Sequence, residues 1–88
     1  MNKSRRKTLM GAVEFMNTAR TALESAQDII EEVMGEEQDA YDNMPEGVQE
    51  SERGETVSDN VDMLEQAFDN IEEAVSNLGE DIENLSGM

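Results

Sequence analysis

The sequence predicts an all-α protein: an antiparallel two-helix coiled-coil hairpin that assembles with copies of itself into a helical bundle. Three observations predict this class. Apolar residues recur at heptad spacing in both halves of the chain, and a segment that contains the only proline separates the halves. The chain also has 22 acidic side chains and only 6 basic ones. Because 88 residues suffice for one domain, we expect a single hairpin domain, with helices at about 5–42 and 55–85 and a loop at about 43–54.

The first helix carries a heptad series that pairs large residues with small ones. Position a holds Leu9, Met16, Leu23, Ile30 and Met44, with Glu37 as the exception, and position d holds Ala12, Ala19, Ala26, Val33 and Ala40. Alanine at successive d positions lets two helices approach closely. We expect Ser4 to cap the start of this helix and Pro45 to end it near residue 42 or 43.

Helix 1 also has more apolar surface than one neighbouring helix can cover. Position g holds Phe15, Ala22 and Ile29, and position e holds Val13, Met34 and Tyr41. A stripe that widens in this way faces two neighbours rather than one. We therefore expect a dimer or a higher even oligomer, and its contact residues are expected to be Val13, Phe15, Ala22 and Ile29.

The loop is expected because Pro45 disfavours helical geometry in the residue before it and Gly54 weakens a helix on the other side. A short helical turn at 45–50 is compatible with this segment. Two caps remain open for the second helix, so its start lies between residues 45 and 56. Ser51 would begin it early, whereas Thr56 would begin it later.

The second helix carries the most regular pattern in the chain. Nine apolar residues follow each other at spacings of four and three: Val57, Val61, Leu64, Phe68, Ile71, Val75, Leu78, Ile82 and Leu85. We expect this stripe to face helix 1 and its central members, Leu64 to Leu78, to be buried. Gly79 is expected to lie off the stripe. An antiparallel hairpin would also place residues 3–7 beside 80–88, where acidic side chains would balance the basic ones.

Composition removes most catalytic chemistry. The chain has no histidine and no cysteine, which are the usual general base, nucleophile and zinc ligands. We expect no enzyme, no cofactor and no metal site. The apolar run after the basic start ends at Glu14, shorter than an export signal needs, and no run is long enough to span a membrane. A cytoplasmic location is expected.

The loop and its flanks carry a resemblance to a known group. The segment E-E-Q-D-A-Y-D-N-M-P-E-G-V-Q-E-S-E-R-G-E, together with the R-R-K start, resembles short acidic coiled-coil hypothetical proteins of Gram-positive bacteria and their phages. The resemblance implies the fold and a phage-type origin, and it brings no activity with it. It also implies that Tyr41, Pro45, Gln49, Ser51 and Arg53 form something more particular than a spacer.

Charge is sorted along the chain, and this sorting gives the functional hypotheses. Residues 1–8 carry a net charge of +4, whereas residues 28–83 carry −19. An acidic rod of this kind repels nucleic acid and anionic membranes and suits a basic protein. We therefore expect a stoichiometric inhibitor of a host or defence protein that imitates the phosphate rows of DNA.

Two alternatives remain open. In the first, the oligomer is a sponge that sequesters an anionic nucleotide or cyclic nucleotide signal between one protomer's N-terminus and another's loop. Its ligand-binding residues would be Arg5, Arg6, Lys7, Tyr41, Gln49, Ser51 and Arg53. In the second, the protein is a scaffold or assembly factor without a small-molecule site.

Overall fold

A computed structural model describes residues 1–88 and contains helices and turns only. α1 spans Lys3–Asp42, α2 is a single short helix over Glu46–Gln49, and α3 spans Glu52–Ser86. The prediction of an all-helical chain is confirmed.

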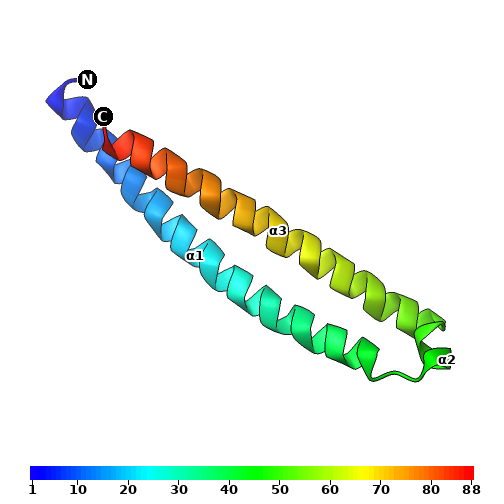
Figure 1. The fold of residues 1–88 in the computed structure, drawn as a ribbon. Helices are drawn as coiled ribbons and strands as arrows, with labels where there is room; N and C mark the ends of the chain where they lie inside the picture. Colours follow the sequence, from blue (N-terminus) through cyan, green and yellow to red (C-terminus); the bar gives the residue numbers. More distant parts are fainter.

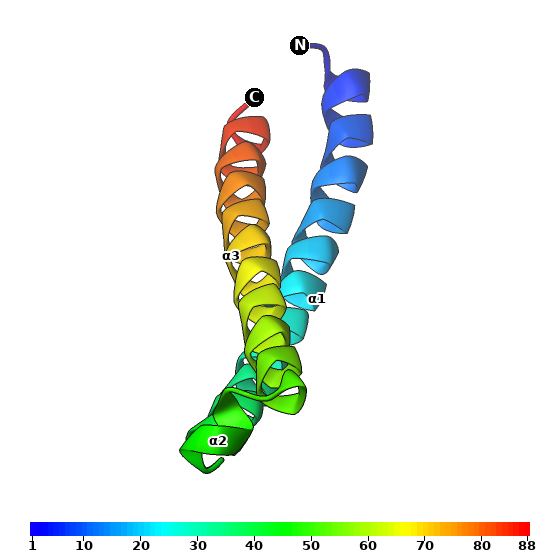
Figure 2. The ribbon, with the colours of Figure 1, turned by 90° about the vertical axis from the view of Figure 1, so that its right-hand side faces the viewer.

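The chain turns back on itself at α2, so that α1 and α3 run side by side in opposite directions and both termini lie at one end (Figure 1). The molecule is a rod 67 Å long and 15 Å by 14 Å across. The two long helices are clearly separated near α2 in Figure 1 and near the termini in Figure 2, so they wrap around each other along the rod.

The apolar stripe of α3 lies on the side that faces α1, and all nine of its residues are half-buried. The expected full burial of its central members, Leu64, Phe68, Ile71, Val75 and Leu78, is wrong for the single chain. Val13, with 6% of its surface exposed, is the one buried hydrophobic residue. Two helices cover each other along one side only, so their contact stays open at both edges.

α1 uses different heptad positions against α3 than the alanine pattern indicated. The a residues are half-buried as expected, but Ala12, Ala19 and Ala40 at position d are exposed. The half-buried or buried partners of the a residues are instead at position e: Val13, Arg20, Gln27, Met34 and Tyr41. These longer side chains cover more of the apolar stripe of α3 than alanine can, and the polar ones contribute their apolar stems.

Polar side chains on this contact find partners. The amide nitrogen Nε2 of Gln27 donates a hydrogen bond to the backbone oxygen of Phe68 at 3.4 Å, the one side-chain hydrogen bond between α1 and α3. Arg20 reaches Gly79, where a Cβ atom would lie 3.2 Å from its Nη1. Gly79 lies beside the apolar stripe and gives the guanidinium group room.

Both long helices begin with a side-chain cap. Asn2, rather than Ser4, caps α1, because its Oδ1 accepts a hydrogen bond from the backbone nitrogen of Arg5 at 2.8 Å. Ser51 caps α3 by accepting from the backbone nitrogen of Gly54 at 3.5 Å. α3 thus starts at Glu52, the earlier of the two alternatives and three residues before the expected 55. Each cap satisfies a donor that the first helical turn leaves free.

Candidate binding surfaces

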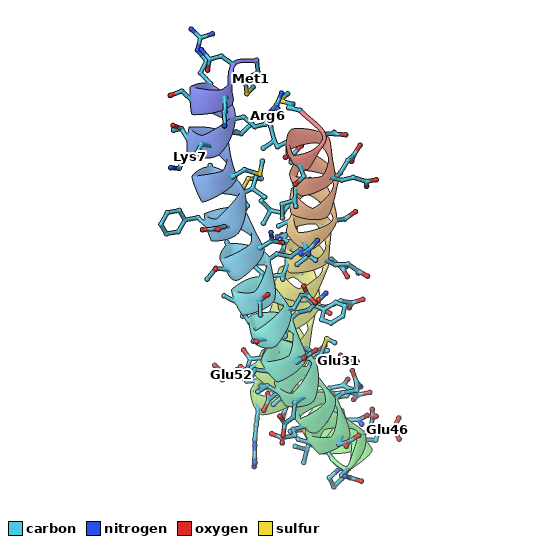
Figure 3. All side chains as sticks on the ribbon, turned by 90° about the vertical axis from the view of Figure 1, so that its left-hand side faces the viewer. Met1, Arg6, Lys7, Glu31, Glu46 and Glu52 are labelled. Carbon is cyan, nitrogen blue, oxygen red and sulfur yellow. The ribbon has the colours of Figure 1, made fainter.

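The most extensive charged feature is the acidic surface, which we define as the exposed carboxylates between Asp28 and Glu83. It includes every acidic residue of that range except the half-buried Glu37. Figure 3 shows Glu31, Glu46 and Glu52 at separate points along the rod. The chain contains a single ion pair, between Arg20 and Glu24 at 3.9 Å. The carboxylates of the acidic surface therefore have no ion-pair partner within the chain.

Acidic side chains are distributed around the rod rather than gathered at one point. No group of three or more carboxylates lies close enough together to hold a metal ion. Their arrangement therefore suits recognition of an extended, positively charged surface better than coordination of a single cation.

The basic segment, residues 3–7, does not pair with α3. Lys3, Arg5, Arg6 and Lys7 are all exposed and none makes an ion pair, and Lys7 points away from α3 in Figure 3. The expected balance between this segment and the acids of residues 80–83 is therefore wrong for the single chain. Pairing of exposed charges gains little against the entropy of long side chains, so proximity at one end of the rod does not bring them together.

The candidate nucleotide-binding residues fall into two groups at opposite ends of the rod. Arg5, Arg6 and Lys7 lie in the first turns of α1, whereas Tyr41, Gln49, Ser51 and Arg53 lie around α2. A single chain does not bring the two groups together. A site that uses both would need two protomers placed head to tail.

Two of the loop candidates have structural partners. Gln49 donates from Nε2 to the backbone oxygen of Tyr41 at 2.9 Å, which ties α2 to the end of α1. The Ser51 hydroxyl donates to the backbone oxygen of Val48 in addition to capping α3. Arg53, by contrast, is exposed and makes no ion pair or side-chain hydrogen bond. Gln49 and Ser51 therefore stabilise the turn, whereas Arg53 has no such partner.

α1 also presents an uncovered apolar face, which we call the apolar flank. It combines positions d and g, and all its residues are exposed except the half-buried Ala26: Ala12, Phe15, Ala19, Ala22, Ala26, Ile29 and Val33. Its large members are strongly exposed, with 80% of Phe15 and 61% of Ile29 open to solvent. The heptad pattern alone places the d residues at a contact inside the hairpin and the g residues at a contact outside it. Their spacing of three and four was the signal that they share one face.

The apolar flank continues towards α3 in the part of the rod nearer α2. Val33 and the 60% exposed Met63 border an open groove of about 320 Å³, which Glu37, Asn60 and Leu64 complete. Val13, the remaining residue expected at an oligomer contact, lies elsewhere. It is buried within the single chain and offers almost no surface to a second protein.

None of the helices contains a stretch of the length and apolar character that crossing a membrane requires. The chain matches no protein-family model, no curated protein and no solved structure.

Proposed function

We propose that the protein is a phage-type, non-enzymatic binding protein that acts stoichiometrically in the host cytoplasm as an inhibitor of a host or defence protein. Its acidic surface would occupy the basic groove of that partner. The observation that carries the proposal is the set of exposed carboxylates along the whole length of α3 and the second half of α1, with no ion pairs among them. Such a surface loses little on binding a basic protein, because it has no existing pairs to break.

The density of charge supports imitation of nucleic acid. A net charge of −16 along 67 Å is one negative charge about every 4 Å, against ~1.7 Å along duplex DNA. Two copies side by side would carry one charge about every 2 Å, which approaches the duplex value. The proposed imitation of DNA therefore depends on self-association, because two copies are needed to approach the charge spacing of the duplex.

The proposed working form is a coiled-coil hairpin within a homo-oligomeric helical bundle. Support comes from the single chain itself, which buries one hydrophobic side chain and leaves Phe15 and Ile29 open to solvent. A domain of this size without disulfides or metal has a small stability margin. Association would cover the exposed apolar residues and enlarge the core.

The nucleotide sponge is the second candidate, and Arg53 with the basic segment favours it. These exposed cations have no carboxylate partner in the chain, and a helix N-terminus suits phosphate. The loop side chains of Gln49 and Ser51 are already engaged in hydrogen bonds. The sponge would thus rest on the arginines and Lys7 more than on the loop amide and hydroxyl.

A capture experiment with two variant sets separates the candidates. The immobilised protein is exposed to a bacterial lysate, and retained proteins and nucleotides are both identified by mass spectrometry. The acid set neutralises four exposed residues of α3: Glu65→Gln, Asp69→Asn, Glu72→Gln and Glu73→Gln. The base set removes three exposed cations: Arg5→Ala, Arg6→Ala and Arg53→Ala.

Inhibition by the acidic surface predicts one basic protein retained at a fixed ratio, displaced by duplex DNA and weakened steeply by salt. With the oligomer intact in both variant sets, the acid set should lose this protein and the base set should keep it. Retention of a nucleotide that only the base set abolishes would replace the inhibitor with the sponge. If neither set changes what is retained while the oligomer stays intact, both are wrong and a scaffold role stands.

A further inference from the structure

The apolar flank of α1 has the length and the composition of a helix-packing surface. It runs from Ala12 to Val33, 22 residues that extend about 33 Å at 1.5 Å per residue. Four of its seven members are alanine. Small side chains let a second helix come close, so that the backbone itself contributes to the contact.

The order of residues along the flank is nearly the same in both directions. Phe15 and Ile29 each lie seven residues from Ala22, and the alanines at 19 and 26 lie on either side of it. A helix that meets its own copy in the opposite direction needs this arrangement, because each residue of a twofold contact must suit its symmetry mate. Phe15 of one copy would then meet Ile29 of the other, twice.

Charge selects the same direction. α1 begins with the basic segment and ends with residues 28–42, which contain seven acidic residues and no basic one. Parallel copies would place the two acidic ends together and the two basic ends together. Antiparallel copies would set each basic segment beside the acidic end of the other copy, with Arg5 in line with the flank and within reach of Glu36 of that copy.

We propose that a second copy of this chain packs on the apolar flank, α1 against α1 in opposite directions, about a twofold axis near Ala22. The proposal rests on the self-association proposed above and gives it a surface, a direction and a centre. It also supplies the basic segment with the counter-charges that its own chain does not place within ion-pairing distance.

Single engineered cysteines test the geometry, since the chain has none of its own. A disulfide needs Cα atoms about 4.4–6.8 Å apart, so a residue on the axis can link to its own copy. Ala22→Cys should form a linked dimer under mild oxidation, with about tenfold more product than the control Thr21→Cys. Thr21 is exposed but lies on another side of α1.

Cysteines away from the axis show whether the two α1 helices run parallel or antiparallel. Phe15→Cys and Ile29→Cys should link poorly when each is oxidised alone and should link to each other when mixed. In a parallel dimer each would link to itself, which would overturn the proposal. A charge exchange tests the direction independently. Arg5→Glu and Glu36→Arg should each weaken self-association, and the double variant should recover most of it.

The failures of the two proposals are distinguishable. If the unmodified protein is a dimer in solution but Ala22→Cys links no better than Thr21→Cys, the flank is not the contact while self-association stands. If the unmodified protein is a monomer at about 100 µM, self-association and the flank contact both fail. In each case helix content by circular dichroism must match the unmodified protein.

Discussion

At Gly54, in the first turn of α3, a Cβ atom would overlap the backbone carbonyl oxygens of Val48 and Gln49. The glycine is buried because α2 packs directly on it. At Gly79, further along α3, a Cβ atom would meet only the mobile end of Arg20, 3.2 Å from Nη1. Glycine is thus required at position 54 by the close backbone of α2, whereas at position 79 it only makes room for the flexible side chain of Arg20.

We expect Gly54→Ala and Gly79→Ala to change stability in opposite directions. Gly54→Ala should lower the free energy of unfolding by about 1–3 kcal/mol, because backbone atoms must move. Gly79→Ala should raise it by up to about 1 kcal/mol, because alanine favours the helix and Arg20 can shift aside. Thermal unfolding followed by circular dichroism measures both. A loss of similar size for the two variants would contradict these contacts.

Gln49 gives a second prediction at this scale. Its hydrogen bond to the Tyr41 backbone is partly buried, so Gln49→Ala should lower the unfolding free energy by about 1 kcal/mol. Gln66→Ala is the control, since Gln66 is exposed and makes no side-chain hydrogen bond. If Gln49→Ala leaves stability unchanged but abolishes nucleotide retention, its role is ligand binding and not closure of the turn.

These residue-scale roles could not be read from the sequence, because each partner belongs to another segment. The pattern around Pro45 predicts a break and allows a helical turn, but it does not say that α2 folds against the start of α3. Without that contact, Gly54 is only a residue that weakens a helix. The loop resemblance marked Gln49 and Ser51 as particular, and their hydrogen bonds now give them a structural task.

Among the elements, α3 was predictable and α1 only in part. The stripe of α3 has a single apolar series, so one face alone can turn towards α1, and all nine residues are half-buried there. α1 offers apolar residues at d, e and g together. Heptad spacing cannot choose among them, because the choice depends on how much area each row covers on α3. In the structure the residues at position e, beginning with Val13, pack against α3 in place of the alanines at position d.

This assignment predicts different effects for two neighbouring residues of α1. Val13→Ala removes buried methyl groups within the hairpin, so the free energy of unfolding should fall by about 1.5–2 kcal/mol at ~0.8 kcal/mol per buried carbon. Self-association should change little, because Val13 has almost no outward surface. Urea unfolding and sedimentation velocity measure the two effects. An unchanged unfolding midpoint would place position 13 outside the contact with α3.

The whole molecule is a rod in which charge and apolar surface occupy different places. The acidic surface extends over the second half of α1 and all of α3, whereas the apolar flank lies on α1 between residues 12 and 33. Raising the salt concentration should therefore separate partner binding from self-association. High ionic strength should release a basic partner, since exposed charge pairs are screened, while an apolar contact between copies should persist.

We propose that one chain is an incomplete folding unit and that Phe15 lies at the contact which completes it. Multi-angle light scattering at micromolar concentration measures whether copies associate through this contact. We expect a mass of at least two 9.8 kDa chains for the unmodified protein and for the surface control Glu83→Lys. Phe15→Glu should shift the mass towards one chain, because it buries a charge in an apolar contact. A stable, fully helical monomer for the unmodified protein would contradict the claim.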